Sequence, residues 1–184
     1  MMRVIAGKVK GHRLKSPGDS TRPTTELVRG AVFSILQSVI NNQSRVLDLY
    51  AGSGALGIEA LSRGASWVDF VEHDPKCCTT IKENLKRTGF TSQAKVYCCS
   101  VSKALTVLSE EYDIVLLDPP YSNSTLVNTL SDLFSSPPVG AGSTIVVQHS
   151  SHQPIPLALK QFHLIKNRHY GDTCLSIYQP EDAN

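Results

Sequence analysis

The sequence lacks any long apolar run. No stretch approaches the roughly 18 consecutive apolar residues of a membrane-spanning helix, and the opening residues MMRVIAGKVKGHRLK lack the apolar segment of about 7 residues typical of a signal peptide. Internal repeats and low-complexity tracts are also missing. We therefore expect a soluble, cytoplasmic protein without membrane contact.

The cysteines lack the spacing of a metal or redox centre. The five cysteines form two adjacent pairs, Cys77-Cys78 and Cys98-Cys99, and Cys174 stands alone. Neither pair has the C-x-x-C spacing of a zinc knuckle or a redox motif. In a reducing cell we expect free thiols that fill helix and strand positions as small apolar side chains, and no metal site.

The charge is distributed unevenly along a chain of ordinary composition. The 184 residues, 41% of them apolar, suit one compact α/β domain with a small appendage. Residues 1–45 contain eight basic and two acidic residues, a net charge of +6, whereas the other 139 residues carry ten basic and fourteen acidic ones, a net charge of −4. Such a basic segment indicates a polyanionic partner, although a solvated surface would show the same charges.

Strand and helix patterns alternate from residue 45 onward. Near-continuous apolar runs occupy residues 46–50, 67–71, 95–98, 114–117 and 144–147. Helical stretches lie between them, such as DPKCCTTIKENLKRTG, which we expect to end at a C-cap on Gly89. Apolar strands separated by helices are typical of a parallel sheet covered on both faces. We therefore predict a doubly wound, Rossmann-like α/β fold.

The two ends of the chain depart from this alternation. RVIAGKVKGHRLKSP predicts one or two short strands around a glycine turn, and TTELVRGAVFSILQSVI predicts an amphipathic helix with Thr24 as its N-cap. QFHLIKNRHY, Gly171-Asp172 and TCLSIYQ predict a closing antiparallel hairpin. We divide the chain into a basic N-terminal extension (1–44), an α/β core (45–180) and a tail (181–184).

A glycine-rich loop marks a candidate nucleotide site. VLDLYAGSGALGIEAL places Gly52, Gly54 and Gly57 in G-x-G-x-x-G spacing between a predicted strand and a predicted helix. Such a loop lets the backbone approach a ligand and directs free helix N–H groups at it. Glu72 lies twenty residues beyond Gly52, at the end of the next strand, where its carboxylate can accept both hydroxyls of a ribose. A tight structural turn is the alternative.

Asp48 favours one cofactor over another. A carboxylate inside the strand before the glycine loop needs a partner. S-adenosylmethionine offers an ammonium group there, whereas a nicotinamide dinucleotide would bring negatively charged phosphates. The alternative that Asp48 caps its own loop amides stays open. Ser100, after the third strand, is a weaker candidate for pairing with the adenine amine.

The stretch DIVLLDPPYSN ends its strand in an unusually rigid corner. Ligands of such sheets bind beyond the carboxyl ends of the strands, which places Asp118 beside the cofactor. Pro119 and Pro120 fix φ at about −65° and donate no N–H, so the corner presents acceptors only. Asp118 and the Pro119 carbonyl match the two hydrogens of an exocyclic amine, while Tyr121 can stack on its base. The motif predicts methyl transfer to a planar amine through orientation and electrostatics, with an ordinary turn as the alternative.

These motifs resemble those of S-adenosylmethionine-dependent amino-methyltransferases. RVIAGKVKGHRL, TRPTTELVRGAVFSIL, DLYAGSGALG, FVEHD, LLDPPY and YGDTCLSIYQ together resemble the bacterial 16S ribosomal RNA guanine-N2 methyltransferases of the RsmD type over nearly the whole chain. The resemblance implies a class I methyltransferase fold, S-adenosylmethionine as the cofactor, and one guanine of small-subunit RNA as the substrate, naked or in an assembling ribonucleoprotein.

The resemblance also implies roles for individual residues. The cofactor site would comprise Asp48, Gly52, Gly54 and Glu72, to which we add Tyr50, Ser53, His73 and Ser100. The catalytic corner would comprise Asp118, Pro119, Pro120 and Tyr121. Arg22, Thr24, Thr25 and Arg29 would lie near the RNA and the site, and the charge of the basic extension adds Arg3, Lys8 and Arg13 as RNA contacts. The chain departs from the family pattern at Gln148, where relatives tend to have Glu, and at Ser100, where they tend to have Asp or Asn.

Other substrates suit the same chemistry. Adenine N6 or cytosine N4 in DNA, or a glutamine amide in a protein, would also fit an acceptor-only corner. The basic extension favours nucleic acid over a protein substrate but does not separate RNA from DNA. A non-catalytic RNA-binding assembly factor is the remaining alternative, and an intact Asp118 beside a full glycine loop disfavours it.

Overall fold

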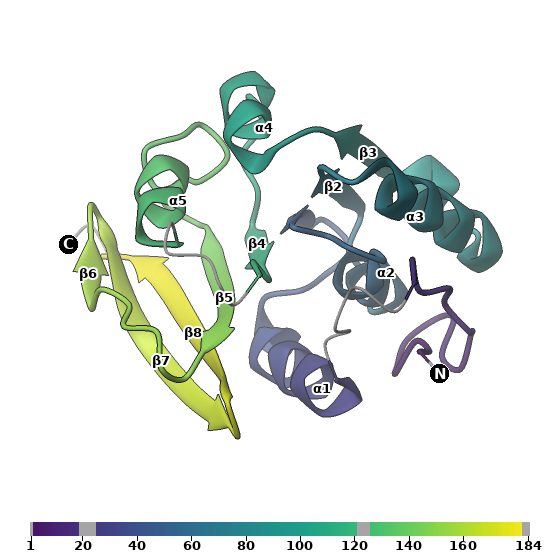
Figure 1. The fold of residues 1–184 in the computed structure, drawn as a ribbon, viewed down its shortest axis with the longest axis horizontal. Helices are drawn as coiled ribbons and strands as arrows, with labels where there is room; N and C mark the ends of the chain where they lie inside the picture. Colours follow the sequence, from purple (N-terminus) through teal and green to yellow (C-terminus); the bar gives the residue numbers. More distant parts are fainter. Residues whose placement is uncertain (1, 19–24, 121–125, 182–184) are drawn as a thin grey trace.

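An eight-stranded sheet forms the centre of the computed structural model, which describes residues 2–18, 25–120 and 126–181. The strand order is β3-β2-β1-β4-β5-β8-β7-β6. The five strands β1 to β5 are parallel, and β8, β7 and β6 continue the sheet in antiparallel pairing (Figure 1). The strands are β1 (Arg45–Leu49), β2 (Trp67–Glu72), β3 (Ala94–Cys98), β4 (Ile114–Leu117), β5 (Thr144–Ser150), β6 (Ala158–Leu159), β7 (Phe162–Tyr170) and β8 (Thr173–Pro180).

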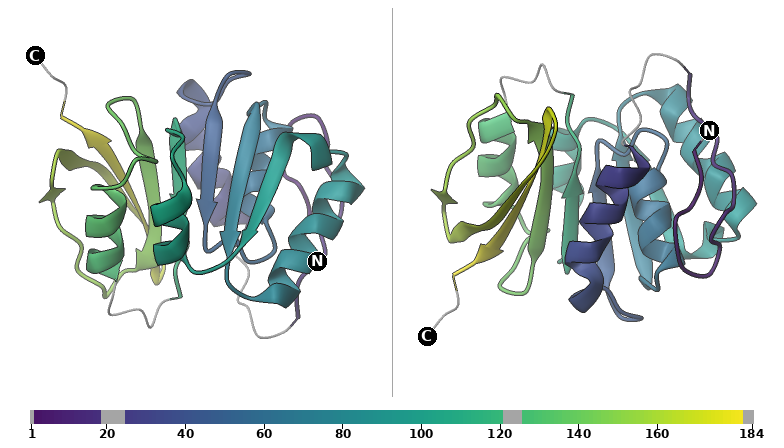
Figure 2. Two further views of the ribbon diagram at one scale, coloured as in Figure 1. Left: turned by 90° about the horizontal axis from the view of Figure 1, so that it is seen from above. Right: turned by 90° about the horizontal axis from the view of Figure 1, so that it is seen from below.

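Helices cover both faces of the sheet, as two views from opposite sides show (Figure 2). Buried residues of α1, α2 and α3 share one apolar cluster with Val46 and Val68, and those of α4 and α5 share a second cluster with Leu47 and Leu49. Alternate residues of one strand therefore face different layers. The helices are α1 (Glu26–Ile35), α2 (Ala55–Ser62), α3 (Pro75–Thr88), α4 (Val101–Val107) and α5 (Leu126–Leu133), with 3-10 turns η1 (Leu36–Ser38) and η2 (Thr91–Gln93).

The predicted α/β sheet and its closing hairpin are confirmed. The predicted strand at 114–117 matches β4, and β7 and β8 form an antiparallel pair around Gly171, whose φ is +61°. Gly89 is the C-cap of α3, with φ +77°. In the described ranges, no helix has both the length and the apolar character needed to cross a lipid bilayer.

Two local predictions near the N-terminus are wrong. The N-cap of α1 is Thr25, whose Oγ1 accepts a hydrogen bond from the Val28 N–H at 3.3 Å, and not Thr24. Thr24 itself lies outside the described residues. The expected N-terminal strands reduce, among the described residues, to one isolated antiparallel bridge between Arg3 and Arg13.

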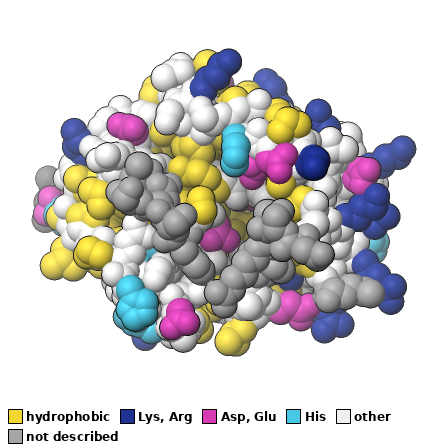
Figure 3. Space-filling view, viewed as in Figure 1, with side chains coloured by type: hydrophobic (Ala, Val, Ile, Leu, Met, Phe, Trp, Pro, Cys, Tyr) yellow, Lys and Arg dark blue, Asp and Glu magenta, His cyan; other side chains and the backbone are white. Residues whose placement is uncertain are grey.

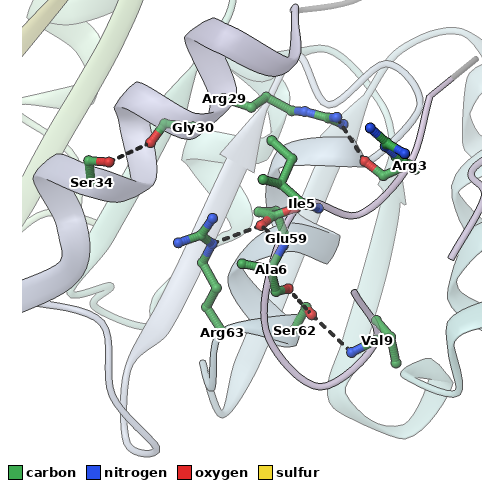
Figure 4. Close-up of polar contacts among 10 residues, drawn as sticks. All are labelled: Arg3, Ile5, Ala6, Val9, Arg29, Gly30, Ser34, Glu59, Ser62 and Arg63. Atoms are coloured by element: carbon green, nitrogen blue, oxygen red, sulfur yellow. Dashed lines mark hydrogen bonds and ion pairs between the residues drawn. The ribbon is translucent and has the colours of Figure 1, made fainter. Parts of the chain in front are cut away.

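The N-terminal arm, defined here as residues 2–18, docks on α2 through its backbone (Figure 4). The Ile5 and Ala6 N–H groups donate to the Glu59 carboxylate at 2.7 and 2.9 Å, and the Lys8 N–H donates to the Ser62 carbonyl at 2.7 Å. Gly7 permits this close approach, since a Cβ there would lie 1.9 Å from the Ser62 carbonyl oxygen. The arm is therefore fixed to the helix that follows the glycine loop.

Candidate active site

A cleft of about 750 Å³ opens at the carboxyl ends of β1, β2, β4 and β5. The strand order reverses between β1 and β4, because β2 and β3 lie on one side and β5 on the other. Open α/β sheets bind their ligands at such a switch point. Leu49 and Leu117 are paired in register, so the residues that follow β1 and β4 leave the sheet side by side.

Each glycine of the loop occupies a position where a side chain would be unfavourable, for a different structural reason. Gly52 and Gly54 have φ values of +54° and +77°, which other residues rarely adopt. Gly54 is the N-cap of α2. Gly57 lets α2 lie against the sheet, because a Cβ there would meet the Phe70 ring at 2.3 Å. Glycine is therefore required by a positive φ at the first two positions and by close packing at the third.

We predict that Gly57→Ala lowers the free energy of unfolding by about 1–3 kcal/mol, because the added methyl group overpacks the interface between α2 and β2. Urea denaturation measures this change. Gly30→Ala in α1 is the matched control, because a Cβ at Gly30 would meet nothing within 4 Å and alanine is the better helix former. Equal stability of the two variants would contradict the packing role of Gly57.

Asp48 is a buried carboxylate that lines the cleft and faces α2. Its side chain is 1% exposed, and its Oδ2 accepts the Gly57 N–H at 2.9 Å. Burial raises the pKa of Asp48 to about 7; the Gly57 hydrogen bond opposes this shift, and the nearby charges of Asp118 and Glu72 add to it. Asp48, Glu72, Asp74 and Asp118 all line the cleft, an arrangement that favours a cationic ligand.

Glu72 holds the glycine loop against the end of β2. Its carboxylate accepts the N–H groups of Gly52 at 2.9 Å, His73 at 2.8 Å and Asp74 at 2.9 Å. The His73 Nδ1 lies 3.0 Å from Glu72 Oε1. Oε1 receives the contacts from His73 and Asp74, whereas Oε2 receives the Gly52 N–H, so Glu72 Oε2 keeps capacity for a hydroxyl in the cleft.

The structure describes most of the predicted site residues, and many of them line the cleft. Those that line the cleft are Asp48, Tyr50, Gly52, Ser53, Glu72, His73, Asp118, Pro119, Pro120 and Thr25. Gly54 caps α2 next to the cleft, and Arg3, Lys8 and Arg13 are exposed on the arm. Arg22, Thr24 and Tyr121 lie outside the described residues.

Ser100 and Arg29 have structural roles of their own. Ser100 is exposed and is the N-cap of α4, where its hydroxyl accepts the Lys103 N–H at 3.3 Å, and its pairing with an adenine amine stays a prediction. Arg29 is 0% exposed, so it presents no surface to RNA. Its Nη2 donates to the Arg3 carbonyl at 2.8 Å instead, which positions the arm (Figure 4).

Sequence reasoning missed several residues that line the cleft: Met2, Ser16, Pro17, Val28, Cys77 and Thr173. Thr173 begins β8, which pairs with β5, so the topology of the hairpin could have placed it near Gln148. The arm residues gave no such signal, because their position depends on docking with α2. The described residues contain no group of three or more His, Cys, Asp or Glu side chains that could hold a metal ion.

Comparisons with known proteins identify the family of the chain. The family model described as "Conserved hypothetical protein 95" matches residues 2–179. The ribosomal RNA small subunit methyltransferase D of Escherichia coli K12 is 30% identical over 181 residues, covering 98% of this chain and 90% of the relative. The Haemophilus influenzae protein of the same name is 32% identical, covering 97% of this chain and 93% of the relative.

A solved structure supports the same grouping. A hypothetical protein of Thermus thermophilus superimposes with a TM-score of 0.85 and 32% identity, covering 97% of this chain and 99% of that protein. Both the family model and the relatives extend over nearly the full chain, from the arm to the hairpin. The chain therefore belongs to the Conserved hypothetical protein 95 family, the family of the ribosomal RNA small subunit methyltransferases D.

Proposed function

We propose that the protein transfers a methyl group from S-adenosylmethionine to the exocyclic N2 amine of a guanine in 16S ribosomal RNA. One observation carries the proposal: the acceptor-only corner at Asp118, Pro119 and Pro120 opens into the same cleft as the glycine loop, Asp48 and Glu72. The names of the relatives support small-subunit RNA as the substrate.

The cleft fits S-adenosylmethionine better than a dinucleotide. Among the described residues that line the cleft there is no Lys or Arg. Four acidic residues line it: Asp48, Glu72, Asp74 and Asp118. Such a lining disfavours phosphates and favours the ammonium and sulfonium charges of S-adenosylmethionine. Asp48 would face the cationic end, and Glu72 would accept ribose hydroxyls. When bound, the cofactor supplies a methyl group activated by its sulfonium.

The corner after β4 would orient the amine. The Asp118 carboxylate and the Pro119 carbonyl would accept its two hydrogens, which draws the nitrogen lone pair out of conjugation with the ring and towards the methyl donor. The amine proton becomes acidic as the N–C bond forms, and the Asp118 carboxylate can take it. Asp118 is half-buried and Pro119 is buried, so a guanine bound in the cleft would displace the water that reaches these acceptors.

The N-terminal arm would contact the RNA backbone, within an RNA-binding extension at residues 1–44 ahead of the catalytic core at 45–180. Arg3, Lys8, Lys10 and Arg13 are exposed, and Arg3 is paired with Glu26 at 3.2 Å. An exposed pair of this kind contributes little to stability, so a phosphate can replace the carboxylate. Under this proposal the protein acts in the bacterial cytoplasm, on free RNA or on an assembling ribonucleoprotein.

We predict that replacing Arg3, Lys8, Lys10 and Arg13 with glutamine weakens RNA binding and reduces the slope of log Kd against log salt by about 3, because each lost phosphate contact removes about 0.7–0.9 from the slope. Fluorescence anisotropy over a salt series measures both quantities. An unchanged slope would assign RNA binding to other residues.

The proposed activity is tested by incubating the protein with labelled S-adenosylmethionine and small-subunit RNA from a strain that lacks this modification. We expect label in N2-methylguanine at one position, in free 16S RNA or in partly assembled subunits. Label in DNA, in protein, or in another base would refute the proposed substrate, and comparing free RNA with particles identifies the preferred form.

A further inference from the structure

Helix α3 carries the largest positive charge among the helices that the structure describes. Its exposed residues include Lys76, Lys82, Lys86 and Arg87, against one acidic residue, Glu83. By contrast, α4 contains one basic residue and α5 one acidic residue. Figure 3 shows Lys and Arg side chains gathered along the edge where α3 and the arm lie in Figure 1. The apolar face of α3 packs into the core, so these cations point outward.

The arm and α3 are joined by a fully buried amide. Asn84, which is 0% exposed, accepts the Lys15 N–H at 2.8 Å and donates from Nδ2 to the Lys15 carbonyl at 3.0 Å. The same Nδ2 donates to the Ser53 carbonyl of the glycine loop, also at 3.0 Å. Both amide hydrogens and the amide oxygen are therefore used, and only an amide at this position supplies all three bonds.

An exposed ion pair links the same two elements at the surface. The Lys15 Nζ lies 2.6 Å from Glu83 Oε2. Glu83 thus neutralises one arm cation at the junction, and Lys and Arg side chains remain in excess along this edge of the molecule (Figure 3). The buried bonds of Asn84, and not this exposed ion pair, hold the arm and α3 in a fixed relation to each other.

The face formed by α3 and the arm ends at the cleft. Pro75 and Cys77 from the first turn of α3 line the cleft, as do Met2, Ser16 and Pro17 from the arm. The cleft itself is acidic, whereas the adjoining face is basic, so a polyanion would bind beside the cleft and not within it. A helix of 14 residues is about 21 Å long, enough to follow several successive phosphates of a nucleic acid strand.

We propose that the exposed cations of α3 form, together with the arm, one binding surface for the phosphate backbone of the RNA substrate. This surface extends the RNA contact beyond the N-terminal extension and directs the RNA strand towards the cleft. Lys82, Lys86 and Arg87 form the part of the surface farthest from the cleft. This inference rests on the proposed function for the identity of the nucleic acid.

The main test replaces Lys82, Lys86 and Arg87 with glutamine and measures the binding of a small-subunit RNA fragment by anisotropy over a salt series. We expect RNA affinity to fall about 10- to 100-fold at low salt and the slope to decrease by about 2. The affinity for S-adenosylhomocysteine, measured by calorimetry, should change less than twofold. The matched control replaces Lys103, Lys160 and Lys166, which are exposed on α4 and near β6 and β7, and should leave RNA binding unchanged.

A second variant tests the surface by gain of affinity. Glu83→Gln removes the one acidic residue of α3 and releases Lys15 from its ion pair, so RNA should bind about 2- to 5-fold more tightly with a steeper salt dependence. Wild-type RNA binding by the triple variant, or weaker binding by Glu83→Gln, would overturn the proposed surface. Because these measurements need no methyl transfer, a wrong substrate base would refute the proposed function and leave this result standing.

Discussion

Replacing Asp118 with alanine is expected to lower kcat for methyl transfer by about 100- to 1000-fold, the loss typical when one preorganised electrostatic contact to the reacting group is removed. Asp118 lines the cleft next to Pro119, and the variant removes the carboxylate that would accept an amine hydrogen and the proton. Single-turnover assays with saturating S-adenosylmethionine and RNA measure the loss. The affinity for S-adenosylhomocysteine should stay within about threefold, since Asp48 and the glycine loop remain.

Two further variants show whether the charge at Asp118 matters. Asp118→Asn keeps the shape and one acceptor oxygen but removes the negative charge and the proton acceptor, so we expect kcat to lie between those of the wild-type protein and Asp118→Ala. Asp113→Ala is the matched control, because Asp113 directly precedes the first residue of β4, at the end of the strand away from the cleft. Its carboxylate accepts the Arg45 N–H at 2.7 Å there. Wild-type kcat in Asp118→Ala, or an equal loss in Asp113→Ala, would show that Asp118 does not orient the amine.

The sequence predicted the elements whose pattern is local. β4 and the hairpin of β7 and β8 were located because buried strands are continuous apolar runs and Gly171 adopts a turn conformation. The glycine loop was predictable for a similar reason: Gly52 and Gly54 have positive φ, a backbone conformation that glycine adopts most readily. The edge of the sheet on which the cleft lies then follows from topology alone.

The arm could not be placed from its sequence. Its alternating pattern predicted strands, but it is held by backbone N–H groups that donate to Glu59 and by Asn84, contacts that leave no periodic signal. Arg29 was misjudged for a related reason: a charged residue normally indicates a surface, yet this one follows Val28 on the buried face of α1. The capping role of Ser100 could not be separated from a ligand contact, because N-capping a helix and contacting a ligand use the same residue type at the same place.

Asp48→Asn is expected to weaken S-adenosylhomocysteine binding by about 10- to 100-fold at pH 8, because a hydrogen bond to a charged group contributes about 1.5–3 kcal/mol. The asparagine would keep the shape of a side chain that is 1% exposed but would offer no charge to the ligand ammonium. Calorimetric titration measures the affinity. An unchanged affinity would mean that Asp48 acts only on its loop, through the Gly57 N–H.

The pH dependence of this affinity follows from the pKa of Asp48, which burial raises to about 7. A cationic ligand binds the ionised carboxylate, so below this pH a proton must leave Asp48 before the ligand can bind. We therefore expect the affinity of the wild-type protein to rise as the pH increases towards about 7 and to level off above it, with proton release detectable by calorimetry in buffers of different ionisation enthalpy. Asp48→Asn should remove this component of the pH dependence.

The same group affects stability with the opposite trend. Because the folded-state pKa of Asp48 lies above its ordinary value of 3.8, the ligand-free folded protein holds the proton longer than the unfolded chain does. The free energy of unfolding should therefore decrease as the pH rises from about 4 through about 7, and Asp48→Asn should reduce that decrease in urea titrations. Bound ligand should reduce it as well, because a cation near Asp48 offsets the cost of the buried charge. If stability and affinity both increased with pH through Asp48, its carboxylate would not be the buried, ligand-facing group described here.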